Sequence, residues 1–210
     1  MSKKIILTGF EPFGNSDVNP STLACQAFDG ENMEDYSIQA YEIPLVFNEI
    51  KEKIVSLLEK KPNAIICTGQ SSRAMLSLER VAINIADVSR TTYNCETKPT
   101  DEILEENGPA GYFTTLPIRK LKENLENNNI PCEISNSAGA FGCNQIFYHL
   151  MHYLAEREIT IPAGFIHVPS LPEQVIGKRI SSMSLDIIKN GLRIILQTLI
   201  DELESNKQSD

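Results

Sequence analysis

Long apolar runs, an excess of basic residues and closely paired cysteines are all missing from this sequence of 210 residues. No apolar run approaches the roughly 20 residues that a membrane-spanning helix needs. The first residues turn polar too soon for a signal peptide, so we expect a cytoplasmic protein. Acidic residues outnumber basic ones by 28 to 19, and the net charge of −9 argues against binding to nucleic acid or to an anionic membrane.

The cysteines predict neither a disulfide framework nor a cysteine-based zinc site. Their number is odd, no two are spaced C-x-x-C, and a reducing compartment would keep them as thiols. We expect most of them to be small buried residues and one to be a candidate nucleophile. The five are Cys25, Cys67, Cys95, Cys132 and Cys143.

The apolar pattern alternates between short β-rich runs and longer runs of helical periodicity. This alternation predicts a single α/β domain over residues 1–210, a three-layer sandwich with a mostly parallel twisted sheet and helices on both faces. The expected strands are residues 3–8, 38–43, 64–68, 81–85, 132–135 and 164–168. The expected helices are residues 21–28, 46–60, 112–127, 143–158 and 181–204.

Two polar stretches interrupt this alternation, at residues 9–21 and 89–108. The second is long enough to be a functional loop or an interface arm. In α/β sheets, ligands bind beyond the carboxyl ends of the strands. The segments that directly follow expected strands are therefore candidates for a site: residues 9–14, 69–73, 136–143 and 167–170.

Cys143 is the first candidate for chemistry, because it opens an expected helix after a run of small residues. The N–H groups of a first helical turn lack partners within the helix and carry partial positive charge, which favours a thiolate and can receive an oxyanion. On a helical projection Cys143 falls near the apolar stripe of Ile146 and Phe147, so its side chain should point inward. An inert buried cysteine fits the same position.

His167 lies near the end of an apolar strand, and Glu79 places a carboxylate at the head of another. Each also has an ordinary interpretation, as a core imidazole and as an ion-paired carboxylate. With Cys143 they form a nucleophile, a base and an orienting group. The imidazole would accept the thiol proton to give a thiolate–imidazolium pair, and the carboxylate would hold the ring.

His149 and His152 lie on one expected helix, away from its apolar stripe. Their i, i+3 spacing suits two metal ligands, but no carboxylate or thiolate partner is obvious. We expect them to lie on a solvated face. A metal-dependent hydrolase that uses both is the least favoured of the functions considered.

Five blocks of sequence follow one another along most of the chain. They are Thr8-Gly-Phe-Glu-Pro-Phe-Gly with Asn19-Pro-Ser; Gly69-Gln with Arg73 and Ser77-Leu-Glu-Arg-Val-Ala-Ile-Asn; Gly108-Pro-Ala-Gly-Tyr-Phe-Thr-Thr-Leu-Pro; Ser135-Asn-Ser-Ala-Gly-Ala-Phe-Gly-Cys-Asn; and Gly164-Phe-Ile-His-Val-Pro-Ser-Leu-Pro-Glu-Gln. On these blocks the chain resembles the pyroglutamyl peptidase I (pyrrolidone-carboxylate peptidase) family of cysteine peptidases.

The resemblance implies an exopeptidase that removes an N-terminal pyroglutamate (5-oxoproline) from peptides, with Cys143 as nucleophile, His167 as base and Glu79 orienting the base. The thiolate would attack the pyroglutamyl carbonyl, His167 would protonate the departing amine, and water would hydrolyse the thioester. Family members resemble a phosphorylase/hydrolase-like α/β fold, use no cofactor or metal, are cytosolic and usually form tetramers. The residues that the resemblance assigns to the substrate pocket are Phe10, Phe13, Gln70 and Phe141.

The chain departs from the family pattern at four places near the expected site. The loop at residues 69–73 is one residue shorter than usual and has serines in place of glycines. Arg90 lies one residue later after Glu79 than the arginine of the family. Leu45 stands where threonine is common, and Gly142 where a larger apolar residue is usual. These changes leave open a catalytically impaired relative that binds pyroglutamyl or other capped peptides.

Overall fold

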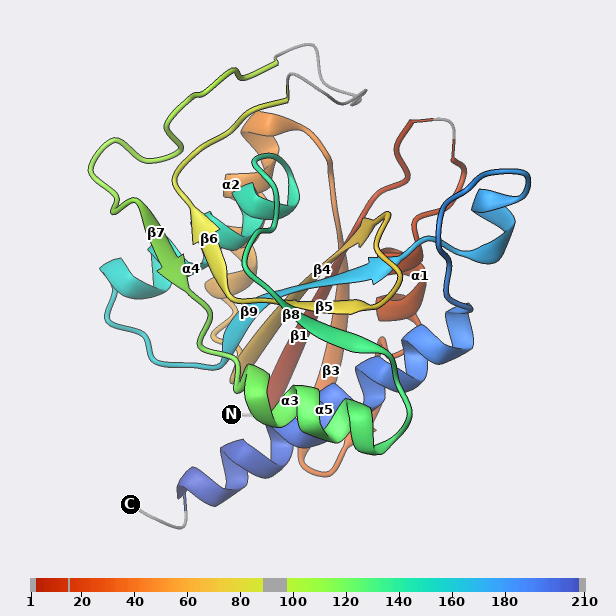
Figure 1. Cartoon of the computed structure of the whole chain (residues 1–210). Helices are drawn as coiled ribbons and strands as arrows, with labels where there is room; N and C mark the ends of the chain where they lie inside the picture. The colour runs from red at the N-terminus through yellow and green to blue at the C-terminus, as the bar shows by residue number, and fades with distance from the viewer. Residues whose placement is uncertain (1–2, 15, 89–97, 208–210) are drawn as a thin grey trace.

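The computed structural model describes residues 3–14, 16–88 and 98–207 of the chain. Its main sheet contains β1 (Lys3–Phe10), β2 (Asn32–Met33), β3 (Tyr36–Ile43), β4 (Ala64–Ser71), β5 (Leu76–Glu79), β8 (Cys132–Ser135) and β9 (Ala163–Pro169). The strand order is β2-β3-β1-β4-β9-β5-β8 (Figure 1). Pairing is parallel from β3 through β1 and β4 to β9 and between β5 and β8, and antiparallel only for β2 with β3 and β5 with β9 within this sheet.

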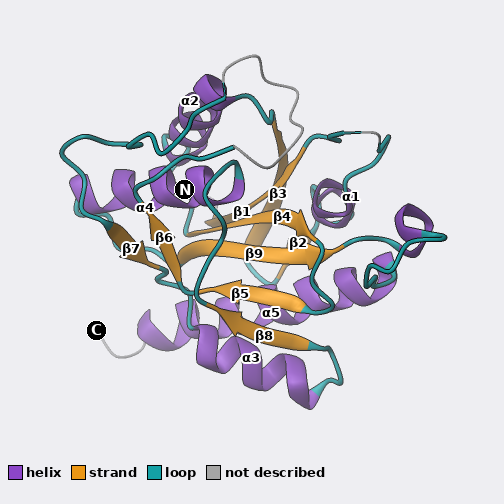
Figure 2. Ribbon diagram, turned by 45° about the horizontal axis from the view of Figure 1, so that its top comes forward, coloured by secondary structure: helices purple, strands orange, loops and turns teal. Residues whose placement is uncertain are grey.

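Helices cover both faces of the sheet. One layer contains α1 (Pro20–Gln26), α3 (Ile118–Asn127) and α5 (Leu185–Lys207), and the other contains α2 (Phe47–Leu58) and α4 (Cys143–Glu156). Figure 2 shows α2 and α4 on one side of the sheet and α3 and α5 on the other. The predicted three-layer α/β fold with a mostly parallel sheet is confirmed. Within the described part of the chain, no helix combines the length and the apolar content needed to cross a membrane.

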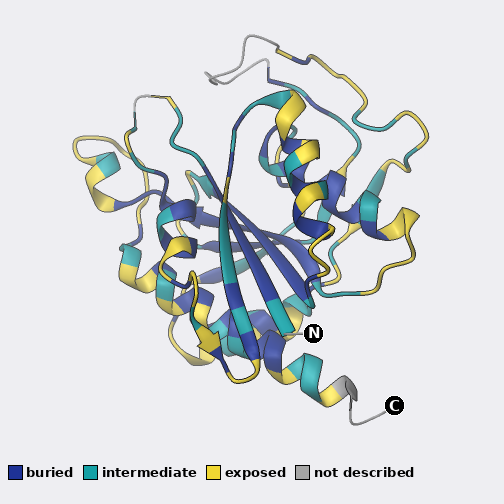
Figure 3. Cartoon of the chain, turned by 180° about the vertical axis from the view of Figure 1, so that it is seen from behind, coloured by how far each residue is buried: buried dark blue, intermediate teal, exposed yellow. Residues whose placement is uncertain are grey.

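The central strands are apolar on both sides because both of their faces are covered (Figure 3). Along β1, Ile5 and Leu7 pack in the layer of α1 and α5, whereas Ile6 packs in the layer of α2 and α4. Ile66 and Cys67 on β4 divide in the same way, and all five residues are fully buried. Strands of this kind read as continuous apolar runs, so the sequence predicts them well.

The segment around residue 80 differs from the prediction of one strand at residues 81–85. The chain forms β5 in the main sheet and then β6 (Val81–Ile83), which pairs with β7 (Gly111–Phe113) in a separate two-stranded sheet. The polar residues Ser77 and Glu79 interrupt the apolar signal of β5. Both are buried and hydrogen-bonded to side chains of neighbouring strands, which the sequence does not reveal.

The helix predicted at residues 112–127 is wrong at its start. Tyr112 and Phe113 pair with β6, and α3 begins at Ile118 directly after Pro117. Proline has no N–H to donate and restricts the residue before it, so it favours the beginning of a helix over its interior. The final helix also begins later than predicted, at Leu185.

The long polar stretch at residues 89–108 is described only from residue 98 onward, and residues 89–97 lie outside the described residues. The described part returns beside α4. Ala86 and Glu102 form a β-bridge, the side chain of Asn84 bonds to both backbone groups of Glu105, and Tyr148 on α4 donates to the carbonyl of Pro109. This return brings Glu105 next to the outer side of α4.

Candidate active site

Cys143 is the first residue of α4, as the sequence predicts. Gly142 turns the chain into the helix with a φ of +44°, a conformation that favours glycine. The buried side chain of Asn144 then bonds to both the N–H and the carbonyl of Ile83 on β6, at 2.9 Å each. These bonds fix the start of the helix, and with it the position of Cys143.

His167 and Glu79 meet across the antiparallel pair of β9 and β5. His167 Nδ1 lies 2.7 Å from Glu79 Oε1, and both side chains are buried. The register brings this about, because Ser77 pairs with His167 and Glu79 follows two residues later on β5. A carboxylate at Nδ1 assigns the ring proton to that nitrogen and leaves Nε2 for proton transfer.

Gly69 brings Cys143 and His167 to the same place. Gly69 on β4 pairs directly with His167 on β9. A Cβ at Gly69 would lie only 2.7 Å from Cys143 Sγ and 2.8 Å from Cζ of Phe165, whose ring packs edge-on against the imidazole with centroids 4.9 Å apart. The thiol of Cys143 therefore lies over Gly69 on β4, and the candidate base His167 is on the neighbouring strand β9.

Burial raises the pKa of the Cys143 thiol to about 12, and the negative charge of Glu79 acts in the same direction. A backbone hydrogen bond at Cys143 and the positive charge of Arg73 lower this pKa but do not offset the burial. The prediction of an easily ionised thiol is therefore wrong for this structure, although Cys143 as a residue keeps some exposure. A protonated thiol has to pass its proton to a base as it attacks.

The other described cysteines, Cys25, Cys67 and Cys132, are buried free thiols, as predicted. Burial raises the pKa of Cys25 and of Cys67 to about 12. Cys25 packs in one apolar core layer and Cys67 in the other, so both behave as small apolar residues. Cys95 lies outside the described residues.

A small cavity of about 40 Å³ lies next to Cys143, which is room for about three water molecules. Phe10 and Phe13, from the end of β1 and the loop after it, line it with aromatic rings, and Asn19 and Gln70 bring amide groups. None of the described residues that line the cavity belongs to the acidic or basic residue types. The full lining is Phe10, Phe13, Asn19, Leu45, Gln70, Gly142 and Cys143.

Two of the departures from the family pattern lie together in this lining. A Cβ at Gly142 would lie 2.7 Å from Cδ1 of Leu45, so Leu45 occupies the space that a larger residue at position 142 would need. Phe141, which the resemblance assigns to the pocket, is not part of the lining, and its ring packs against Phe47 with centroids 6.3 Å apart. Arg90 lies outside the described residues.

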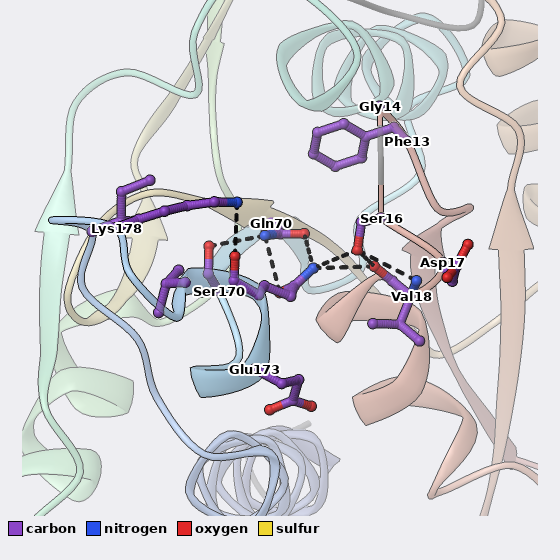
Figure 4. Close-up of a pocket in the computed structure, with 12 residues that line it drawn as sticks. Phe13, Gly14, Ser16, Asp17, Val18, Gln70, Ser170, Glu173 and Lys178 are labelled. Atoms are coloured by element: carbon purple, nitrogen blue, oxygen red, sulfur yellow. Dashed lines mark hydrogen bonds between the residues drawn. The ribbon is translucent and has the colours of Figure 1, made fainter.

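A wider pocket of about 670 Å³ adjoins the small cavity and shares Phe13 and Gln70 with it (Figure 4). The Gln70 amide nitrogen donates to Ser170 Oγ at 2.9 Å and to Gln174 Oε1 at 3.2 Å. Gln174 donates in turn to Ser16 Oγ at 2.9 Å. Gln174, which the sequence analysis did not single out as a site residue, thus ties Gln70 to the loop after β1.

Arg73 is a second residue of the site whose role the sequence did not reveal. Its Nη1 lies 2.6 Å from Glu79 Oε1, the same oxygen that faces His167. The only signal in the sequence is its place in the block that begins at Gly69. The partner could not be assigned from that block, because β5 was not recognised as a strand.

The two histidines on α4 do not lie on a solvated face, and that prediction is wrong. His149 is 4% exposed, and its Nδ1 lies 3.0 Å from Glu105 Oε1, which also pairs with Lys51. His152 is partly buried, with Nδ1 2.9 Å from the Tyr112 hydroxyl. The segment that returns beside α4 covers these residues. Among the described residues, no group of three or more His, Cys, Asp or Glu side chains is arranged to hold a metal ion.

Comparison with known proteins agrees with this geometry. The sequence model of the family described as pyroglutamyl peptidase matches residues 3–202. The pyrrolidone-carboxylate peptidase of Bacillus licheniformis is 46% identical over 196 residues, which cover 92% of this chain and 91% of that protein. The corresponding protein of Bacillus subtilis is 40% identical over 200 residues, covering 94% and 93%.

Solved structures give the same result. Pyroglutamyl peptidase I of Bacillus amyloliquefaciens is 39% identical with a TM-score of 0.90, covering 95% of each chain. Pyrrolidone carboxyl peptidase of Pyrococcus furiosus is 35% identical with a TM-score of 0.91, covering 95% of this chain and 99% of the other. With the fold, the helix-start cysteine and the family match in agreement, this chain belongs to the pyroglutamyl peptidase family.

Proposed function

We propose that the protein is a cysteine exopeptidase that removes an N-terminal pyroglutamyl residue from peptides. Membership of the pyroglutamyl peptidase family supports the reaction. One observation supports the assignment of residues. The Cys143 thiol lies over Gly69 at the edge of a small uncharged cavity, and Gly69 pairs with His167 on the neighbouring strand. A thiol and a base beside an uncharged recess are what this reaction requires.

In the proposed reaction, His167 Nε2 accepts the proton of Cys143 as the sulfur attacks the pyroglutamyl carbonyl carbon. The raised pKa of the thiol favours proton transfer during attack over a thiolate formed in advance. The N–H groups at the start of α4 stabilise the oxyanion. The C–N bond then breaks as the imidazolium returns its proton to the leaving amine, and a thioester remains on Cys143.

Water completes the cycle. His167 takes a proton from the water as its oxygen attacks the thioester carbonyl, and the thiol is regenerated when pyroglutamate leaves. Glu79 keeps the ring in place through Nδ1 and stabilises the imidazolium in both halves of the reaction. The proposed triad is therefore Cys143, His167 and Glu79, with no metal or cofactor in any step.

Recognition of the pyroglutamyl ring follows from the chemistry of the small cavity. Pyroglutamate is a neutral lactam without a free amine, so the carboxylates with which an ordinary aminopeptidase binds an amine have nothing to pair with. The rings of Phe10 and Phe13 offer flat apolar surface, and the Gln70 amide offers hydrogen bonds to the lactam. Phe141, the remaining residue that the resemblance assigns to the pocket, packs its ring on Phe47 and does not line the small cavity.

The assembly and location of the protein are part of the proposal. We infer that the chain acts as one pyroglutamyl-peptidase-like domain, in the cytoplasm and as a homotetramer. Phe113 and Ile176 are 71% and 80% exposed in the single chain, and contact with a partner chain would bury such residues. Sedimentation velocity at micromolar concentration tests this directly, and a monomer would contradict it.

The test of function is the release of a fluorescent amine from a pyroglutamyl amide by the purified protein. Wild type should cleave this substrate and leave the prolyl amide, which lacks the lactam carbonyl, uncut. Cys143→Ala should abolish cleavage, whereas Cys132→Ala, which removes another buried thiol, should keep it. Thiol alkylation should inhibit and chelators should not.

Two results would contradict the proposal. Activity that survives Cys143→Ala would indicate another nucleophile. Well-folded wild type that binds a pyroglutamyl peptide without cleaving it would favour the alternative, a binding relative. That alternative has its own support in the departures from the family pattern at Leu45 and Gly142, both of which line the cavity beside the sulfur.

A further inference from the structure

Glu79 is a buried carboxylate whose charge needs compensation. Its side chain is fully buried, and its Oε1 lies 2.7 Å from His167 Nδ1 and 2.6 Å from Arg73 Nη1. A buried carboxylate is stable as an anion only when it is paired and hydrogen-bonded. A neutral imidazole supplies a hydrogen bond but no charge. The charge must come from Arg73, because a guanidinium is protonated at every relevant pH.

Arg73 also holds the segment that leads to the nucleophile. Nη1 donates to Ser135 Oγ at 3.0 Å, and Nη2 donates to the carbonyl of Ser137 at 2.8 Å. Ser135 ends β8, and Ser137 lies in the loop that runs to Cys143 at the start of α4. One guanidinium thus joins the strand that carries Glu79 to the loop that positions Cys143.

We propose that Arg73 is a positioning residue of the proposed peptidase: it pairs with the buried Glu79 carboxylate that faces His167 and couples that pair to the loop before Cys143. This inference rests on the proposed function. Arg73 is not part of the lining of the small cavity, and its contacts are with the enzyme's own groups. It acts through Glu79 and the loop, without touching the pyroglutamyl ring.

The charge of Arg73 also reaches the sulfur. Glu79 raises the pKa of Cys143 and Arg73 lowers it, so the two charges oppose each other there. Removal of Arg73 leaves the effect of Glu79 unbalanced. The thiol then ionises at higher pH, and its reaction with an alkylating agent slows at any pH below its pKa.

The test compares wild type with Arg73→Ala, Arg73→Lys and Arg119→Ala, the last removing an exposed arginine on α3 as a control. In Arg73→Ala we expect kcat on the pyroglutamyl amide to fall about 10- to 100-fold with KM changed less than about 3-fold. Arg73→Lys should recover part of kcat, since an ammonium replaces the charge but cannot span Glu79, Ser135 and Ser137 together. Added guanidinium ion should partly restore Arg73→Ala.

The second readout does not depend on turnover. The pH profile of iodoacetamide labelling at Cys143, followed by mass spectrometry of its peptide, should move upward by on the order of one pH unit in Arg73→Ala, which is about tenfold slower labelling below the pKa. Arg119→Ala should keep the wild-type profile. A purely structural role would lower stability and leave the profile in place.

Three outcomes would overturn the proposal: unchanged kcat in Arg73→Ala, a loss that appears in KM instead, or a labelling profile that does not move. Failure of the proposed function looks different. In that case wild type does not cleave the pyroglutamyl amide at all, while the comparison of labelling profiles still decides whether Arg73 acts on the site.

Discussion

Gly69→Ala tests whether the sulfur of Cys143 lies where the candidate site requires it. A methyl group at this position would lie 2.7 Å from Cys143 Sγ and 2.8 Å from Cζ of Phe165, about 1 Å closer than van der Waals contact allows. The strand cannot move away easily, because Gly69 is paired with His167 in the sheet. The sulfur and the ring must therefore shift by roughly 1 Å together.

The expected loss of activity follows from this displacement. A misplacement of about 1 Å at a reacting atom reduces rate about 100-fold, equivalent to about 2.7 kcal/mol of transition-state stabilisation. Overpacking at a buried strand position also costs about 1–3 kcal/mol of unfolding free energy. We expect Gly69→Ala to remain folded with kcat/KM on the pyroglutamyl amide reduced about 100-fold, measured beside urea unfolding.

Gly191→Ala is the matched control for overpacking. A Cβ there would lie 2.5 Å from Cδ1 of Leu76 and 3.3 Å from Cγ2 of Ile130, in the layer of α3 and α5 on the far face of the sheet. It should change stability while keeping kcat/KM within about twofold of wild type. If Gly69→Ala retains wild-type kcat/KM, the sulfur does not lie over Gly69 and the geometry of the site is wrong.

Two further predictions concern neighbouring groups. Gly142→Ala should lower both stability and kcat/KM, because the added Cβ would lie 2.7 Å from Cδ1 of Leu45. Leu45→Ala, made in the same protein, should restore part of each. A double-mutant cycle measures this coupling, and purely additive effects of the two substitutions would contradict it. Burial lowers the pKa of His149 to about 4, below its ordinary value of 6.5, so the folded protein binds fewer protons than the unfolded chain between these values. The contribution of neutral His149 to the free energy of unfolding is fully present above about pH 6.5, and at most about 3 kcal/mol of it is lost as the pH falls to about 4. His149→Gln should therefore reduce the pH dependence of the free energy of urea unfolding between about pH 4 and about pH 6.5. An unchanged pH dependence would refute the assignment.

Much of the fold was predictable because its central strands are buried on both faces. Ile5, Ile6 and Leu7 form a continuous apolar run for that reason, and the chain around them alternates strand and helix. The errors occur where tertiary contacts replace the local signal. Glu79 is accommodated as a buried strand residue because His167 on β9 and Arg73 in the loop before β5 both pair with it.

The sequence predicted the candidate reactive residues of the site, but not the residues that hold them in place. A cysteine at a helix start after small residues, such as Cys143, is a local signal. The partners of Glu79 and Asn144 are not local signals. Arg73 reaches Glu79 only through the fold of the loop that leads into β5, and Asn144 bonds to Ile83 on β6, far away in the sequence. The prediction that the Cys143 thiol ionises easily was wrong for a related reason. The helix start that lowers a thiol pKa is visible in the sequence, but the burial that raises the pKa depends on the whole fold.

In the proposed reaction, Cys143 forms a thioester with the pyroglutamyl group. The most direct measurement is acid quenching of wild type during turnover of a pyroglutamyl ester, followed by peptide mass spectrometry. We expect one added pyroglutamyl group on the peptide that contains Cys143, lost on incubation at neutral pH and absent from Cys143→Ala. A pyroglutamyl group on any other residue, or turnover of the ester without an adduct on Cys143 under conditions that trap acyl-enzymes, would contradict it.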